Sequence, residues 1–233
     1  MIILSELKVF VGDSLLVIAP HPDDESLGCG GLMSRLAHLG TDCHVLIATG
    51  SVTSHGFDNW KSHQCSEAIG GMIDALQSKS VTGLGYESSK LEMLPMLSLI
   101  DSFRSVLEAV RPSTVCLPWN GDAHSDHRIC HAIGLATTKA FRSTYIRNVL
   151  TYETLSETNV AGVSQEIVFK PGLWVDISAH LTNKVNACLR YQSEFAEHPF
   201  PRSEASIRAL AVLRGSECNA LAAEAFGVVR SFM

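Results

Sequence analysis

Short apolar runs alternate with amphipathic stretches along most of the chain. Residues 15–19 (LLVIA) form an apolar run that ends at a proline, which is typical of a buried strand. Leucines at helical spacing then predict a helix over residues 28–39, ended by Gly40. A second apolar strand is expected at residues 43–48. A strand, a helix and a strand in close succession indicate a β-α-β unit and therefore parallel strands.

The same alternation continues towards the C-terminus. It predicts helices over residues 61–76, 92–110, 126–140, 179–192 and 204–214, and strands over 81–84, 114–117 and 149–153. Residues 166–170 and 173–177 flank Pro171-Gly172 and are expected to pair as a hairpin, while EAFGVVRSF is expected to close the sheet edge. We therefore predict one α/β domain over residues 1–233, with three layers, a mainly parallel sheet and helices on both faces.

Composition narrows the classes of partner and the compartment. The net charge of −6 argues against a non-specific nucleic-acid binder and against a basic membrane-surface protein. No apolar run reaches the roughly 18 residues of a membrane-spanning helix, and Glu6 precedes any long apolar run, so we expect neither a span nor a signal peptide. The seven cysteines form no CxxC pair, which predicts reduced, buried thiols and a cytoplasmic location rather than disulfides or a thiolate metal site.

Polar side chains gather directly after two of the predicted strands. The first cluster is His21, Asp23, Asp24 and Glu25, and the second is Asp122, His124, Asp126 and His127. Ligands of open α/β sheets bind beyond the carboxyl ends of the strands. If the two strands are neighbours, histidines and a carboxylate face one point, which suits a hydrolytic Zn²⁺ with an open position for water, or Fe²⁺. A divalent cation would also offset the acids of the first cluster, which contains no lysine or arginine.

Each cluster taken alone has a plainer explanation. An acid shortly after a strand commonly caps the next helix, and two histidines three residues apart are a weak metal signal. Their occurrence together after apolar strands is what favours a metal site. GCGG after the first strand is similar to a dinucleotide-binding turn, but GxGxxG is absent and the second strand ends in ATGS rather than an acid. We therefore expect these glycines to serve close strand–helix packing.

The two clusters also carry a family resemblance. PHPDDESLGCGG together with DAHSDHR resembles the LmbE-like, or PIG-L, family of zinc-dependent N-deacetylases. VDISAHLTNKVNACLRYQSE and AAEAFGVVR resemble later segments of the same family. The resemblance implies a Rossmann-like α/β fold that serves as a hydrolase scaffold. It also implies removal of the N-acetyl group from an N-acetylglucosamine-type amino-sugar conjugate, a small-molecule substrate.

The resemblance implies a role for each residue at a matching position. His21, Asp24 and His127 would be the metal ligands. Asp23 would be the general base, and His124 would stabilise the oxyanion of the transition state.

Less specific roles are expected for four further residues. Asp126 would orient or tune His124. An arginine followed by a glutamate often stands in the helix after the second strand of the family, whereas this chain reads WKSHQCSEAIGG there, so Lys61 would take the place of that arginine in contacting substrate. Trp119 and Asp122 are expected to be further substrate contacts.

Two other function classes remain open at this point. One is a different single-metal hydrolase, an amidase or a phosphoesterase, and the other is a non-catalytic, metal-dependent sugar-binding protein. An intact Asp23 favours catalysis because a carboxylate beside the ligands is needed for proton transfer rather than for binding. The sequence leaves open the group attached to the sugar, a homo-oligomeric state, the native metal, and whether His124 or Asp23 protonates the leaving amine.

Overall fold

The computed structural model of the chain describes residues 4–50, 59–161 and 168–232, and the side chains of 4–6, 9 and 59–64 fall outside the description. The strands are β1 (Ser14–Ala19), β2 (Asp42–Thr49), β3 (Ser80–Tyr86), β4 (Thr114–Pro118), β5 (Asn148–Tyr152), β6 (Leu173–Asp176) and β7 (Ala223–Ser231). The α-helices are α1 (Leu4–Val11), α2 (Asp24–His38), α3 (Asn59–Leu76), α4 (Met96–Val110), α5 (Ser125–Thr137), α6 (Leu181–Cys188) and α7 (Glu204–Ser216). Two short 3₁₀ helices, η1 (Leu91–Met93) and η2 (Gln192–Glu194), complete the elements.

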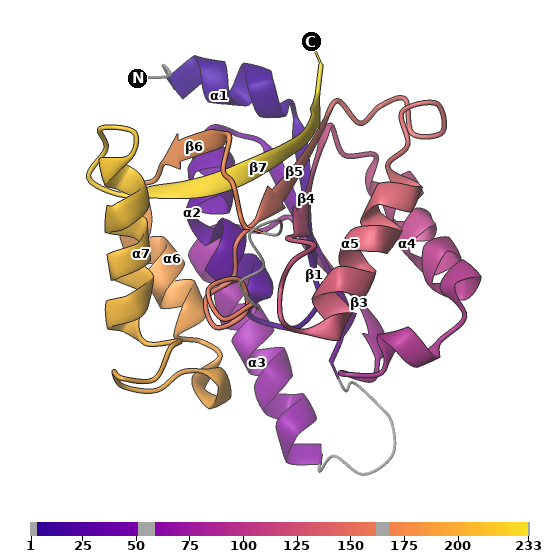
Figure 1. The fold of residues 1–233 in the computed structure, drawn as a ribbon, viewed down its shortest axis with the longest axis horizontal. Coiled ribbons are helices and arrows are strands. Elements are labelled where there is room, and N and C mark those ends of the chain that lie inside the picture. Colours follow the sequence, from indigo (N-terminus) through magenta and orange to yellow (C-terminus); the bar gives the residue numbers. More distant parts are fainter. Residues whose placement is uncertain (1–3, 51–58, 162–167, 233) are drawn as a thin grey trace.

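The seven strands form one sheet in the order β3-β2-β1-β4-β5-β7-β6 (Figure 1). The first five in this order are parallel, and β7 is antiparallel to both of its neighbours. β1 lies beside β4, with Leu15 opposite Thr114. The predicted mainly parallel sheet is confirmed, and the two strands that precede the polar clusters are neighbours.

Helices cover both faces of the sheet, as predicted. Leu15 and Val17 of β1 belong to a core that contains side chains of α2 and α3, whereas Leu16 and Ile18 belong to a core that contains side chains of α4 and α5. Successive side chains of a strand point to opposite faces, so a strand of uninterrupted apolar residues is buried on both sides. Figure 1 shows α2, α3, α6 and α7 on one side of the sheet and α4 and α5 on the other.

Glycines in α2 allow this helix to lie close to the sheet. A Cβ atom at Gly28 would come within 2.1 Å of the Tyr152 ring, and one at Gly31 within 2.6 Å of Ile177. Tyr152 is fixed in turn, because its hydroxyl donates to the Ile18 carbonyl at 2.8 Å. The GCGG segment therefore serves packing, as the sequence predicts.

A buried ion pair between Glu224 and Lys184 also holds α2. Glu224 of β7 accepts the backbone N–H groups of Gly31 and Leu32 at 2.8 and 2.7 Å, and the Lys184 ammonium at 2.6 Å. Lys184 also donates to the Leu27 carbonyl at 2.6 Å. α2 is thus tied to α6 and β7 through backbone groups as well as through apolar contacts.

Several helix predictions were wrong in their bounds. α2 begins at Asp24 rather than at Gly28, since the acids before the glycines form its first turn, where acidic side chains are favoured. The helix predicted over residues 92–110 is divided into η1 and α4 at Pro95, whose ring removes a backbone donor and disfavours helix at the residue before it. α1 was not predicted, although its Leu7 and Val11 are buried in the core.

The C-terminal part also differs from the prediction. Residues 168–172 form no strand and 162–167 lie outside the described residues, and β6 pairs with β7 instead. β7 is therefore internal rather than at the edge, and β6 is the edge strand on this side of the sheet. The prediction was wrong because strand order depends on long-range pairing that the local pattern does not encode. The helix predicted over 179–192 ends at Cys188. No helix in the described ranges has the length and apolar character to cross a membrane.

The close approach of α2 to β5 leads to a stability prediction. Gly28→Ala should lower the free energy of unfolding by about 1–3 kcal/mol because the new methyl group overlaps the Tyr152 ring. Gly70→Ala is the matched control: Gly70 lies in α3 with open space around its Cα, so the change should stabilise the protein by up to about 1 kcal/mol. Urea denaturation of both variants measures the difference, and equal stability of the two would contradict the packing argument.

Candidate active site

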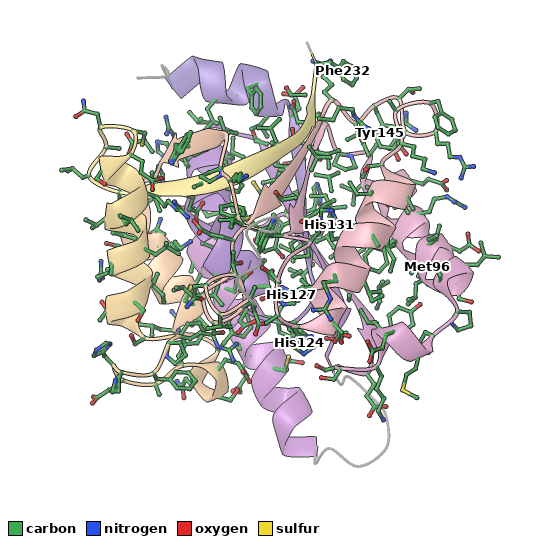
Figure 2. All side chains as sticks on the ribbon, viewed as in Figure 1. Met96, His124, His127, His131, Tyr145 and Phe232 are labelled. Atoms are coloured by element: carbon green, nitrogen blue, oxygen red, sulfur yellow. The ribbon has the colours of Figure 1, made fainter. Side chains whose placement is uncertain are left out.

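The two polar clusters meet at the carboxyl ends of β1 and β4. The first lies in the turn between β1 and α2, and the second in the loop between β4 and α5. Figure 2 shows His124 and His127 at the start of α5. The ring centroid of His21 lies 4.4 Å from that of His124 and 5.4 Å from that of His127. Strand adjacency thus joins residues that are about a hundred positions apart in the chain.

Three of these side chains form a compact group of ligand atoms. Asp24 Oδ2 lies 3.3 Å from His21 Nδ1 and 3.3 Å from His127 Nε2. The ligand atoms of all three residues lie within 4.8 Å of one another. The two distances of 3.3 Å match the separation of neighbouring tetrahedral ligands that each lie about 2 Å from one ion. This is the ligand set that the family resemblance implies.

A buried carboxylate backs each of the two histidines. His127 Nδ1 donates to Asp122 Oδ2 at 2.8 Å, and His21 Nε2 donates to Asp126 Oδ2 at 3.0 Å. Thr158 donates in turn to the other oxygen of Asp122 at 2.6 Å. Metal-binding histidines are typically held in this way, with the hydrogen bond fixing the tautomer and the ring orientation. The remaining ring nitrogens are consequently directed at Asp24.

Asp126 has a different partner from the one predicted. Its carboxylate accepts from His21 and from the backbone N–H of Ser89 at 2.7 Å, while it lies 3.9 Å from His124 Nδ1. Its link to His124 runs through the backbone, because the Asp126 N–H donates to His124 Nδ1 at 3.1 Å. His21, His124 and Asp126 form a second group within 4.8 Å, but the hydrogen bond between His21 and Asp126 already occupies those atoms.

Two of the three residues expected to contact substrate, Asp122 and Trp119, do not line the cavity that opens over this site. Asp122 is 1% exposed and lies behind His127. Trp119 is buried, with its ring against Gly121 and Phe169. Lys61 lies in the first turn of α3, and its side chain falls outside the described part of the chain.

Asp23 lies at the start of α2 in a strained and buried position. Its φ of 130° is one that residues other than glycine rarely adopt, and such strain costs about 1–3 kcal/mol and is typical of functional sites. Its side chain is 2% exposed. Burial and the neighbouring Asp24 and Glu25 raise the pKa of Asp23, and the Arg202 guanidinium opposes this shift. Arg202 Nη1 donates to Asp23 Oδ2 at 2.7 Å.

His124 caps the N-terminus of α5 and faces the cavity. Because its Nδ1 accepts the Asp126 backbone N–H, the proton of the neutral ring is on Nε2, which lies 3.3 Å from Ser89 Oγ. Burial and the nearby His21 lower the pKa of His124, so the neutral form prevails at pH 7. His124 therefore presents an N–H donor rather than a cation.

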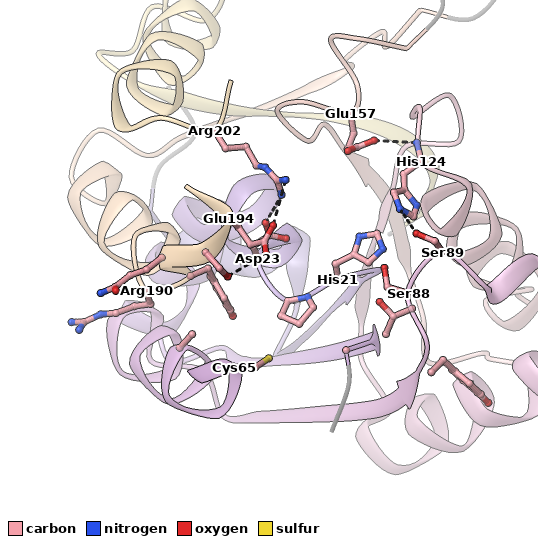
Figure 3. A pocket seen from close by; sticks show the side chains of 18 of the residues that line it. His21, Asp23, Cys65, Ser88, Ser89, His124, Glu157, Arg190, Glu194 and Arg202 are labelled. Carbon is pink, nitrogen blue, oxygen red and sulfur yellow. Dashed lines mark hydrogen bonds and ion pairs between the residues drawn. The ribbon is translucent and has the colours of Figure 1, made fainter. Parts of the chain in front are cut away.

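A cavity of about 920 Å³ opens over this site (Figure 3). His21, Asp23 and His124 line it beside residues from β3, α3, η2 and the segment before α7. The volume lies in the range of sites that bind small molecules. Figure 3 shows Arg202 reaching towards Asp23 across the cavity wall and Glu157 beside His124.

Several residues of the site were not predicted from the sequence. Arg202 and Glu157 stand in no motif, and Glu157 accepts the backbone N–H of His124 at 3.0 Å. Glu25, which has no assigned role in the predicted site, is fully buried and accepts the Tyr191 hydroxyl at 2.9 Å. Tyr191 belongs to the RYQSE segment of the resemblance, which was the one signal in the sequence for this contact.

The carboxylate behind His127 gives a prediction for metal affinity. Asp122→Ala should weaken zinc binding by about 10–100-fold because the ring loses the partner that fixes its tautomer. Asp101→Ala serves as the control, since Asp101 lies on the surface of α4 and pairs with Arg104. Competition with a coloured chelator measures both affinities, and equal affinity of the two variants would contradict the role of Asp122.

Proton release on metal binding gives a second prediction. Burial lowers the pKa of both ligand histidines, but Asp126 and Asp24 raise that of His21 to about 9, and Asp24 and Asp122 raise that of His127 to about 10. Both rings are thus protonated at pH 7 without metal, whereas a metal binds the neutral ring. Calorimetry in buffers of different ionisation enthalpy should show about two protons released per zinc at pH 7 and fewer as the pH approaches 10. Binding without proton release would contradict these shifts.

Comparison with known proteins places this site in a family. The family model described as "PIG-L: GlcNAc-PI de-N-acetylase" matches residues 16–138, more than half of the chain. A diacetylchitobiose deacetylase of Thermococcus kodakarensis is 25% identical over 209 residues, which cover 86% of this chain and 77% of that protein.

Solved structures share the fold. The N,N'-diacetylchitobiose deacetylase of Pyrococcus horikoshii matches 94% of this chain and 84% of its own, with a TM-score of 0.74 and 19% identity. GalB, the 4-carboxy-2-hydroxymuconate hydratase of Pseudomonas putida, matches 95% of this chain and 98% of its own, with a TM-score of 0.74 and 15% identity. A hydratase with the same fold means that the fold alone does not fix the reaction. By the match over residues 16–138, which includes both polar clusters, the chain belongs to the PIG-L family of GlcNAc-PI de-N-acetylases.

Proposed function

We propose that this protein is a zinc-dependent hydrolase that removes the N-acetyl group from an N-acetylglucosamine-type amino-sugar conjugate, giving a free amine and acetate. The observation that carries the proposal is the group of His21, Asp24 and His127, whose member His21 lines one cavity together with Asp23 and His124. Membership of the PIG-L family supports it, as does the diacetylchitobiose deacetylase of Thermococcus kodakarensis.

The donor set fits a catalytic zinc site. Two imidazoles and one carboxylate are typical ligands of hydrolytic zinc, and each imidazole is held by a buried carboxylate. Fe²⁺ accepts the same donors. When bound, such an ion supplies a Lewis acid that polarises an amide carbonyl and lowers the pKa of a water molecule.

Asp23 is placed to act as the general base. Asp23 lies between two ligand residues in sequence and lines the cavity together with His21, one of the three proposed ligands. It would take a proton from the attacking water as the carbon–oxygen bond forms. A buried carboxylate with a raised pKa is suited to hold that proton at neutral pH.

His124 is placed to stabilise the oxyanion. Its Nε2–H faces the cavity and donates a hydrogen bond to an oxygen as negative charge develops there. Because His124 presents a neutral N–H, we assign delivery of the proton to the leaving amine to Asp23. C–N bond cleavage then yields the amine and acetate.

Features of the whole chain support the proposed domain organisation, location and substrate class. The sheet takes strands from both ends of the sequence, which supports one catalytic domain over residues 1–233. All seven cysteines are described and are free thiols, which supports a reducing, cytoplasmic location. The cavity volume and its polar lining support a small sugar conjugate as the substrate.

Acetate release from several N-acetylated sugar conjugates is the direct test. Turnover should be lost with a chelator and restored by zinc, and Asp23→Asn should lower kcat by about 10²–10⁴-fold because it removes the proton acceptor. Asp101→Asn on the surface of α4 is the control and should leave kcat unchanged.

Three results would overturn the proposal. Turnover that is indifferent to the chelator or to Asp23→Asn would exclude the mechanism. Phosphate release without acetate release would indicate another metal hydrolase, and sugar binding without any product would indicate a binding protein.

A further inference from the structure

We propose that Arg202 is a positioning residue that fixes the carboxylate of Asp23 for proton transfer. The inference rests on the proposed function in so far as Asp23 is the general base there. Arg202 is 179 positions away in the chain, and it reaches Asp23 with an Nη1–Oδ2 distance of 2.7 Å.

Three consecutive acids are buried at the start of α2, and each has its own partners. Asp23, Asp24 and Glu25 are 2%, 2% and 0% exposed. Each acid needs its own compensation, because a buried charge without a partner is strongly unfavourable. Asp24 lies between the two ligand histidines, and Glu25 accepts the Ser26 and Tyr191 hydroxyls and the Asp23 backbone N–H.

The charge of the Asp23 carboxylate is compensated by the Arg202 guanidinium. Among the described residues, Arg202 is the one side chain that donates a hydrogen bond to the Asp23 carboxylate. The β1–α2 turn itself contains no lysine or arginine. The orientation of the Asp23 carboxylate is therefore set by a group on a distant segment.

Arg202 is itself held in place by its neighbours. It directly precedes Ser203, which is buried and caps α7 by accepting the Ser206 N–H at 3.2 Å. Its Nη2 lies 3.5 Å from Glu194 Oε2 of η2. The guanidinium thus spans two carboxylates, a geometry that its planar fork favours (Figure 3).

The surroundings of Arg202 differ from those of a purely structural side chain. Arg202 lines the cavity and its side chain remains 24% exposed, so it is not part of the packed core. Its Nε is buried without a partner in the described structure, so its place is determined by the two ion pairs rather than by a full set of hydrogen bonds. The reach to Asp23 thus serves the site rather than the stability of α7.

The kinetic test uses zinc-loaded Arg202→Ala. Its kcat should fall by about 100-fold while KM changes by less than threefold, because a misplaced base slows the chemical step without removing a substrate contact. Arg202→Lys should recover part of kcat, since lysine restores the charge but not the fork. Added guanidinium ion should raise kcat of Arg202→Ala alone. Arg208→Ala on α7, which breaks an exposed pair with Glu204, is the control and should retain kcat.

A structural readout makes the test independent of turnover. Crystal structures of zinc-loaded wild type and Arg202→Lys, and of Arg202→Ala where it folds, should show the Asp23 carboxylate fixed in wild type and displaced or in several rotamers in the variants. Zinc content and the midpoint of thermal unfolding identify a variant that has merely failed to fold.

The outcomes are distinct. An unchanged kcat, a change in KM alone, or an unmoved Asp23 carboxylate would overturn the role of Arg202. If the wild type releases no acetate from any conjugate, the proposed function fails, and the position of Asp23 in the variants still decides whether Arg202 holds it.

Discussion

Three consecutive carboxylates buried at the carboxyl end of β1 are the constraint on which the site depends. Asp23, Asp24 and Glu25 repel one another and lose their hydration, so each requires compensation from elsewhere in the fold. His21 and His127 lie beside the Asp24 carboxylate. The Tyr191 hydroxyl donates a hydrogen bond to Glu25, and Arg202 donates one to Asp23. Apart from His21, the partners lie in α5, directly before η2 and in the segment before α7, so the compensation of the acids depends on the whole fold.

The parallel sheet explains how these partners arrive. In a sheet of this type the loops after neighbouring strands converge at one edge, and β1 and β4 are neighbours here. α2 must approach the sheet closely for its first turn to reach that edge, and Gly28 permits the approach. The Glu224–Lys184 pair then holds α2 at backbone groups. Packing in the middle of α2 thus fixes the position of the carboxylates at its start.

Much of the fold and the ligand set could be predicted from local pattern. Apolar runs located β1, β2, β4 and β5 because a strand buried on both faces is continuous in hydrophobicity. The order of β6 and β7 in the sheet could not be predicted. The local sequence pattern does not show which strands pair, because paired strands are remote from each other in the chain. Asp122 was expected in the cavity and lies behind His127 instead, because a polar loop residue shows its type in sequence but not its direction.

The sequence by itself determined the chemistry that is available: two histidines and adjacent acids after apolar strands, in a motif pair that indicates a metal-dependent deacetylase. These features are local, and their spacing reflects strand ends and helix starts. Only the tertiary structure decided which carboxylate backs which ring, with Asp126 behind His21 rather than His124, and which cation reaches Asp23. The choice of hydrogen-bond partner depends on differences of a few tenths of an ångström in the distances between segments that are remote in the chain. Those distances follow from packing alone.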